Sequence, residues 1–374
     1  MRKLIAAVAL TVLAPGTQAV LAAETSVRGT VYADWMMSLT DGANHYNAFT
    51  IDRAYLGAES KLSDYTSLRI TLDIRPDRFS TPATTIIDSD GDTLKVPALT
   101  AYSGYPIILK YAYGDFKPKP VAKVLKLRLG LQPTMYLNYI EGIWNRRYIE
   151  RSINDLNSWT TSSDLGLSAL ASLGPSGNFG EVGVSVLNGT KYSEVVDKNK
   201  HKDFNVFTKL TPFYNSGDFN QIAFVGQFYS GVQNRTILDT ESGSDWKRQL
   251  ASVGTRLAYQ KKLDLCADVN FQTLGQGATA SDLKQSGLSF FGNLYLDALL
   301  PSAKALRTLV LWGRYDQYDP NTDAADDGYA LVFAGVECAP IKGVKAAVVY
   351  RQTTLQAANS VVGKALMLNT EFKF

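Results

Sequence analysis

The sequence predicts an all-β protein, a membrane-spanning antiparallel up-and-down β-barrel of about 16 strands. Three observations lead to this prediction. Apolar and polar residues alternate through most of the chain, the connections are short and long in turn, and the last segment ends on an aromatic residue, Phe374. Because successive side chains of a strand point to opposite faces, the alternation indicates two different surroundings, with lipid outside the barrel and water inside it.

The alternation defines the strands. In "SLRITLDI" (67–74) and "VLKLRLGLQ" (124–132), every second residue is leucine or isoleucine. About 16 segments of roughly ten residues show such a pattern, which is the length that a tilted strand needs to cross a membrane. Their expected bounds are 25–37, 48–62, 66–75, 106–116, 122–132, 160–172, 179–189, 203–213, 219–230, 247–259, 263–273, 285–297, 305–317, 328–338, 343–353 and 363–374.

The connections between these segments are short and long in turn. Turn-like stretches such as "SDY" (63–65) and "KPKPV" (117–121) alternate with longer polar ones at 38–47, 76–105, 133–159, 190–202, 231–246, 274–284, 317–327 and 354–362. In an up-and-down meander this places all long connections at one end, as in outer-membrane barrels with short periplasmic turns and long extracellular loops. A water-soluble β-sandwich is the alternative, but its connections need not sort by length to one end.

The beginning of the chain indicates export. Residues 1–22 combine Arg2 and Lys3 with an apolar run and small residues, which is typical of a cleaved signal peptide, and residues 23–374 would form the barrel. We therefore expect the outer membrane of a Gram-negative bacterium. The two cysteines, Cys266 and Cys338, lie on candidate strands three apart, too far for a disulfide. A net charge of +3 does not argue for nucleic acid as a partner.

Two stretches of sequence resemble known families. The terminal strand, with Phe372 and Phe374 on its apolar face, resembles the assembly signal of Gram-negative outer-membrane proteins, which implies the barrel-assembly machinery as a partner. The blocks "FTIDRAYLGAESKLSDYTSLRITLDI" (49–74), "KLRLGLQPTMYLNYIEGIWNRRYIERS" (126–152), "SSDLGLSA" (162–169) and "VSVLNGTKY" (184–192) resemble the phosphate-selective porin O and P family. This resemblance implies a sixteen-stranded barrel, a homotrimer in outer-membrane lipid and lipopolysaccharide, and passive conduction of small hydrophilic solutes.

The polar faces of the strands carry both charges, with a modest excess of bases. Extrapolating the alternation, the inward bases are Arg28, Arg53, Lys61, Arg69, Arg75, Lys126, Arg128, Lys209, Arg248, Arg256, Arg314, Lys345 and Arg351. The inward acids are Asp34, Glu59, Asp73, Asp164, Asp268, Asp297, Asp316, Glu337 and Glu371. The excess favours anions, and the family resemblance implies phosphate-like ones. The alternative is a mixed-charge wall that merely keeps the lumen wet.

The candidate anion-binding residues form two groups. Arg53, Arg69, Lys126 and Arg128 lie on the early strands, and Arg146, Arg147 and Arg151 lie in the third long connection, 133–159. In porins of similar architecture the third long loop folds into the barrel and forms a constriction. If it does so here, these arginines would offer guanidinium groups to an anion. Alternatively they pair with Glu141, Glu150 and Asp155, or bind lipopolysaccharide phosphates from outside.

No pattern for catalysis, a metal or a cofactor stands out. The acidic run "DSDGDT" (88–93) departs from a calcium-binding loop in the position of its glycine. His45 and His201 fall in expected outer connections with no obvious partner, and nothing near Cys266 in sequence would activate its thiol. We therefore expect no enzyme and no cofactor. A barrel hydrolase and a structural or adhesive surface barrel remain as alternatives.

Overall fold

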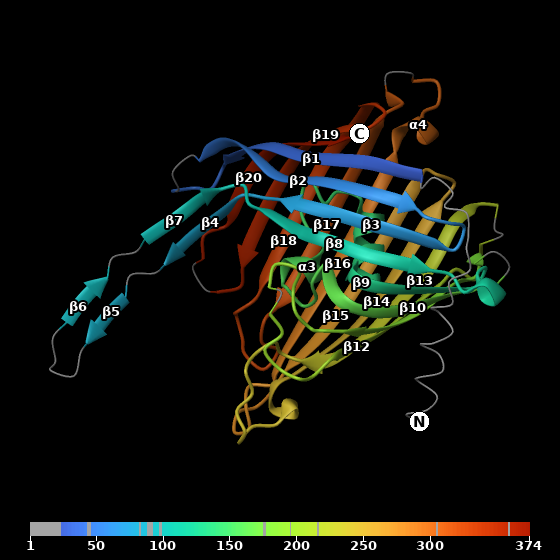
Figure 1. Ribbon diagram of the computed structural model, residues 1–374. Helices are drawn as coiled ribbons and strands as arrows, with labels where there is room; N and C mark the ends of the chain where they lie inside the picture. Colours follow the sequence, from blue (N-terminus) through green and yellow to red (C-terminus); the bar gives the residue numbers. More distant parts are fainter. Residues whose placement is uncertain are drawn as a thin grey trace.

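The computed structural model is a closed antiparallel β-barrel, which confirms the predicted fold class (Figure 1). It describes residues 24–42, 46–81, 84–87, 93–96, 99–174, 177–194, 196–214, 217–303, 306–357 and 360–374, and for 77–103 and residue 220 it describes the backbone alone. The expected signal peptide (1–22), His45 and all but the last residue of the acidic run 88–93 lie outside these ranges.

All sixteen predicted strands are present, and each end lies within four residues of its expected position. Each barrel strand pairs with its neighbours in chain order, and β1 pairs with β20 to close the sheet. The barrel strands are β1 (Glu24–Ser38), β2 (Asn47–Lys61), β3 (Thr66–Ile74), β8 (Ile107–Phe116), β9 (Leu125–Pro133), β10 (Ser163–Leu173), β11 (Gly180–Leu187), β12 (Asp203–Leu210), β13 (Phe219–Val232), β14 (Lys247–Tyr259), β15 (Leu263–Leu274), β16 (Leu283–Tyr295), β17 (Leu309–Asp319), β18 (Tyr329–Ile341), β19 (Val344–Leu355) and β20 (Gly363–Lys373).

The connection 76–105 differs from the prediction of a long polar loop. It contains four short strands, β4 (Asp77–Thr81), β5 (Thr84–Ile87), β6 (Thr93–Val96) and β7 (Leu99–Gly104), and these form two further two-stranded sheets, β4–β7 and β5–β6. Threonine and isoleucine in "TTII" (84–87) favour extended backbone, which the search for membrane-length segments overlooked.

The described helices are short. They are α2 (Met135–Trp144), α3 (Ile153–Leu156), α4 (Leu296–Leu299) and the 3-10 turns η1 (Lys119–Val121) and η3 (Gly243–Trp246). In the part of the chain that the structure describes, no helix has the length and apolarity needed to cross a membrane. Only α2 and α3 lie in the connection that was expected to enter the barrel.

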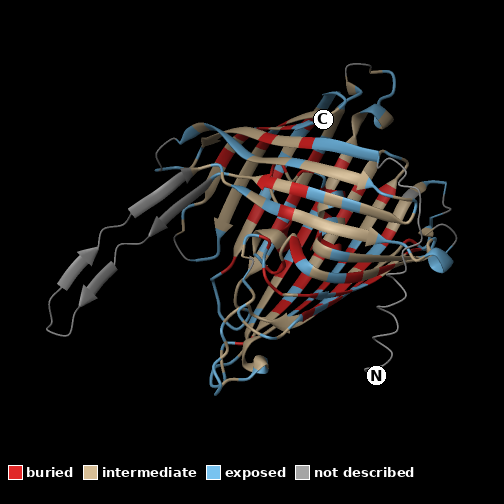
Figure 2. Cartoon of the chain, in the orientation of Figure 1, coloured by how far each residue is buried: buried red, intermediate tan, exposed pale blue. Residues whose placement is uncertain are grey.

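Burial alternates along the barrel strands, as Figure 2 shows by its bands of buried and exposed residues. In β15, for example, Asp264, Asp268 and Asn270 are buried on the inner face, whereas Phe271 is exposed on the outer face. The polar face of each strand therefore points into the barrel, as the sequence predicts. The inner face also carries large apolar residues, such as Phe291 and Phe333, whose surroundings are described below.

The C-terminal residue completes the closure of the sheet. Backbone hydrogen bonds of 3.1 Å join Gly29 and Phe374 in both directions. A Cβ atom added to Gly29 would lie 2.0 Å from the Phe374 ring, so the ring packs directly over this glycine. Phe374 thus ends the last strand and covers the first, on the outer surface of the barrel at the end where both described chain ends lie.

Candidate functional site

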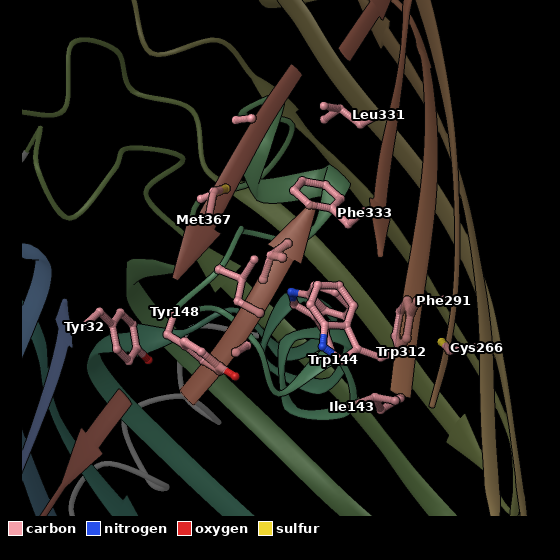
Figure 3. Close-up of a cluster of buried hydrophobic side chains, with 14 residues drawn as sticks. Tyr32, Ile143, Trp144, Tyr148, Cys266, Phe291, Trp312, Leu331, Phe333 and Met367 are labelled. Atoms are coloured by element: carbon pink, nitrogen blue, oxygen red, sulfur yellow. The ribbon is translucent and has the colours of Figure 1, made fainter. Parts of the chain in front are cut away.

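The connection between β9 and β10 folds into the barrel. Its helices α2 and α3 carry apolar side chains that are almost completely buried, among them Tyr136, Trp144 and Ile153. Trp144 lies edge-on to Phe291 and Trp312 of the wall, with ring centroids 5.2 and 5.4 Å away (Figure 3). The apolar residues on the inner face of the later strands are therefore explained by this packing, which removes them from water.

Polar contacts fix the same connection to the wall. The Tyr136 hydroxyl donates a hydrogen bond of 2.5 Å to Asp268 of β15, and the Trp159 ring nitrogen donates one of 2.8 Å to Gln285 of β16. The Arg146 Nε lies 3.1 Å from Glu337 Oε2 of β18, which also accepts a hydrogen bond from the Tyr148 hydroxyl. Buried polar groups need such partners, so the contacts define one position for the connection.

Open space remains between the connection and the strands β1, β2, β3, β8 and β20. An inner cavity of about 410 Å³, towards the short turns, is lined by Tyr55, Arg69 and Lys110 among others. An outer cavity of about 160 Å³, towards the long connections, is lined by residues that include Arg75 and Arg151. Arg147 of the inward connection lines both cavities, which places it where they meet.

Three cationic side chains converge on one hydroxyl oxygen at this meeting point. The Tyr55 oxygen of β2 accepts hydrogen bonds from Arg53 Nη1 at 3.1 Å, Lys110 Nζ at 3.2 Å and Arg147 Nε at 3.4 Å. These donors come from β2, β8 and the inward connection. We call Arg53, Tyr55, Lys110 and Arg147 the constriction cluster.

The sequence alternation missed Lys110. Strict alternation in "IILKYAYGDF" (107–116) assigns Tyr111 and Tyr113 to the inner face and Lys110 to the outer one. A register shift relative to β3 leaves Lys110 without a partner residue between Leu109 and Tyr111, so Lys110 and Tyr111 both line the inner cavity. A β-bulge re-aims a side chain in this way. The sequence did contain one signal that Lys110 points inward, because strict alternation would place this lysine on the side that faces lipid.

The charges of the cluster are only partly compensated. Arg53 Nε lies 3.4 Å from Asp73, and Arg147 pairs with Glu141 at 2.9 Å and with Asp155 at 2.7 Å. Lys110 is 4% exposed, and within the described ranges no carboxylate oxygen lies within 4.0 Å of its ammonium. Instead its ammonium lies 4.7, 5.7 and 5.2 Å from the ring centroids of Tyr55, Tyr111 and Tyr192.

Electrostatic pairing shifts the pKa values of two residues of the inward connection, Asp155 and Arg147. Burial acts to raise the pKa of Asp155, but the Arg147 guanidinium outweighs it and holds this pKa below the ordinary value of an aspartate. Burial acts to lower the pKa of Arg147, but Glu141, Tyr55 and Asp155 outweigh it and raise this pKa well above its ordinary value. Arg147 therefore stays charged where the cavities meet.

The wall residues predicted from sequence do not form a single cluster. Arg53 belongs to the constriction cluster, and Arg69 lines the inner cavity with its guanidinium 4.9 Å from the Tyr111 ring centroid. Arg128 instead makes a two-fold hydrogen bond to Asp115, at 2.7 and 2.9 Å. Neither Arg128 nor Lys126 lines either cavity, so the expected grouping of these two with Arg53 is wrong. Strand twist and tilt separate them by height in the barrel.

The three arginines of the inward connection have different surroundings. Arg146 points into the wall and pairs with Glu337, Arg147 belongs to the constriction cluster, and Arg151 lines the outer cavity. The alternative of pairing with acids of the same connection holds for Arg147, through Glu141 and Asp155. The sequence also missed Tyr192, a residue of the β11–β12 connection whose hydroxyl donates a hydrogen bond of 2.7 Å to Asp73.

The described residues show no metal-binding arrangement. They contain no group of three or more His, Cys, Asp or Glu side chains placed to hold a metal ion. Cys266 is buried on the inner face of β15, in the apolar cluster that includes Ile143 and Trp144 (Figure 3). This leaves the two cavities and the constriction cluster as the candidate site.

Comparison with solved structures identifies the fold. An outer membrane protein of Vibrio cholerae, OmpT with loop L8 deleted, matches with a TM-score of 0.59 at 12% identity, over 95% of this chain and all of its own. The outer membrane channel DcaP of Acinetobacter baumannii matches with a TM-score of 0.57 at 14% identity, over 96% of this chain and all of its own. An anion-selective porin from Comamonas acidovorans matches with a TM-score of 0.59 at 9% identity, over 94% of this chain and all of its own.

The chain has the fold of the bacterial outer-membrane porins. No protein-family model matches the sequence, and no curated protein matches it either. The resemblance to the phosphate-selective porin O and P family therefore stays a prediction. Within this fold, the inward connection between β9 and β10 leaves the two cavities on the side of β1, β2, β3 and β8.

Proposed function

We propose that this protein is an outer-membrane porin, a water-filled channel for passive diffusion of small hydrophilic solutes. One observation carries the proposal: the connection 134–162 fills one side of the barrel and leaves two cavities that meet at Arg147 on the other side. A barrel of about 16 strands is too wide to be filled by its own wall residues. We infer that the two cavities together form a narrow, charged passage through the cylinder, which would admit small solutes and reject large ones.

The surroundings of the barrel are part of the proposal. The exposed apolar residues on the outer face, such as Phe224, Phe271 and Leu368, would meet hydrocarbon, and the long connections would meet lipopolysaccharide. Residues 1–22 would be removed on export, and Phe372 and Phe374 would be bound by the barrel-assembly machinery. Assembly as a homotrimer rests on the family resemblance, and OmpT of Vibrio cholerae, one of the matching structures, is described as a trimer form.

We further propose that the channel prefers anions. The outer cavity is lined by five bases, Arg53, Arg75, Arg147, Arg151 and Lys191, against one acid, Asp155. At the constriction cluster, Lys110 adds a further positive charge, and among the described residues no carboxylate oxygen lies within 4.0 Å of its ammonium. Basic side chains at the narrow part of a pore favour anions. The porin O and P resemblance adds phosphate-like ions to the expected solutes.

Reconstitution into planar bilayers tests the function. The purified protein should give stepwise, ohmic conductance in KCl, and the reversal potential in a KCl gradient should have the sign of anion preference. A silent bilayer together with hydrolase activity would support a barrel enzyme instead, and a silent bilayer without activity would support a structural or adhesive surface barrel. A reversal potential with the sign of cation preference would support the channel but contradict the proposed anion preference.

A further inference from the structure

The constriction cluster has fewer acceptors than donors. A phenolic oxygen offers two lone pairs, whereas three cationic groups, from Arg53, Lys110 and Arg147, donate to the oxygen of Tyr55. At least one of these donors is therefore poorly satisfied at any moment. A buried cationic donor without a full set of acceptors attracts a further oxygen, and the inner cavity gives a solute access to Lys110.

The charged groups of the constriction cluster limit how much negative charge a bound solute can carry. Arg53 is balanced by Asp73, and Arg147 is flanked by Glu141 and Asp155. Within the constriction cluster, Lys110 is the base that has no carboxylate oxygen within 4.0 Å among the described residues. The three cations of the cluster therefore face three carboxylates, and a group with one negative charge disturbs this balance less than a dianion does. A dianion would bring a second negative charge close to three carboxylates, which is unfavourable.

The rest of the surface around Lys110 is aromatic. The rings of Tyr55, Tyr111 and Tyr192 surround its ammonium, and Tyr32 packs edge-on to Tyr55 with ring centroids 5.9 Å apart. Leu137 of the inward connection lines the same cavity. These rings offer contact to a hydrocarbon or aromatic body, which a bare oxyanion lacks.

We propose that the preferred solutes of this channel are organic monocarboxylates with an apolar or aromatic body, bound transiently with the carboxylate at Lys110 and the body against the tyrosine rings. This inference rests on the proposed porin function and narrows it. It also departs from the phosphate-like solutes that the sequence resemblance implies. Of the bases named above, Lys110 would bind the carboxylate and so determine the specificity, although the sequence alternation placed this residue outside the lumen.

Block of the chloride current distinguishes these solutes. Single-channel conductance of the full-length processed protein is recorded in KCl at pH 7 while potassium benzoate, acetate or phosphate is added. We expect benzoate to reach half-block at a concentration about three- to tenfold lower than acetate, the ratio that one aromatic contact typically contributes. Phosphate should need a higher concentration than either carboxylate.

Two variants assign the effect to the cluster. Lys110→Met should weaken block by both carboxylates, and Tyr111→Leu should abolish the difference between benzoate and acetate while retaining acetate block. Lys126→Met is the matched control, because Lys126 is an inward base that lines neither cavity, and it should behave as the wild type. Heat-modifiable migration on a gel verifies folding, and Lys110→Gln replaces the methionine variant if that one does not fold.

The possible results distinguish a failure of the monocarboxylate inference from a failure of the porin proposal. Stronger block by phosphate than by benzoate, or benzoate block that survives in both Lys110 variants, would overturn the monocarboxylate assignment and leave the porin intact. A bilayer that stays silent in every salt would refute the porin proposal, and the inference would fall with it. Benzoate block that disappears with Lys110 and loses its advantage with Tyr111 supports the site as described.

Discussion

Arg146 and Glu337 form a buried ion pair between the inward connection and β18, with Nε 3.1 Å from Oε2 and the side chains only 5% and 10% exposed. Arg146 also donates a hydrogen bond of 2.5 Å to Asn293 of β16, and Tyr148 shares the Glu337 carboxylate. One wall residue thus holds two residues that flank Arg147 in the chain. The position of Arg147 in the passage depends on contacts made on the opposite side of the connection.

Breaking this pair should loosen the constriction without unfolding the barrel. Glu337→Gln leaves the buried Arg146 without its counter-charge, which typically costs about 3–5 kcal/mol. Because the backbone pairing of the sheet is unaffected, we expect larger and more variable single-channel conductance and faster proteolysis within 134–162. The control is Asp323→Asn, which removes an exposed pair with Lys284 and should change little. Unchanged conductance steps in the glutamine variant would show that other contacts suffice.

Reversing the charge at the constriction should reverse part of the selectivity. Lys110→Glu places a negative charge beside Asp73 and Glu141, and local anion concentration should fall by about tenfold or more. The measurement is the reversal potential in a KCl gradient, which should move towards cation preference. Lys126→Glu and Arg128→Glu should move it much less, because neither residue lines the cavities. If these variants shift the potential as strongly as Lys110→Glu, the passage lies elsewhere.

The contact of Gly29 with Phe374 predicts a steric effect on barrel closure. Valine at position 29 would place methyl groups where the Phe374 ring lies, since even a Cβ would approach it to 2.0 Å. Such overpacking costs about 1–3 kcal/mol. We expect a smaller folded fraction, measured by heat-modifiable gel migration after refolding into detergent.

A second change tests whether this effect is steric. In the double variant Gly29→Val with Phe374→Ala, the valine should cost less than in the wild-type background, because the ring is gone. Gly226→Ala is a matched glycine control, since its added Cβ would meet no atom closer than 3.6 Å. If Gly29→Val lowers the folded fraction equally in both backgrounds, its effect does not come from the contact with Phe374.

The two cysteines should remain free thiols with different reactivity. Cys266 is buried on the inner face of β15 under the inward connection, whereas Cys338 is partly exposed on the outer face of β18. We expect no change in gel mobility on reduction, and maleimide labelling of Cys338 before Cys266 in detergent, measured by mass spectrometry. Labelling of Cys266 at the same rate would indicate that the connection leaves the wall.

The sequence determined the number, order and approximate ends of the strands, because alternation and turn composition are local properties of the backbone. It also determined which connections lie together at one end. For the same reason it placed Arg53 and Arg69 correctly on the inner face. Wherever a residue's direction followed from its own strand, the sequence was sufficient.

The tertiary structure alone decided what the passage contains. A bulge against β3 turned Lys110 inward, and packing on Phe291 and Trp312 decided which side of the barrel the inward connection fills. The same packing sent Arg146 to the wall and Arg147 to the passage, although they are neighbours in the chain. These outcomes depend on partners that are distant in the chain, 92 residues for Arg147 and Tyr55 and 191 for Arg146 and Glu337, and no local period carries that information.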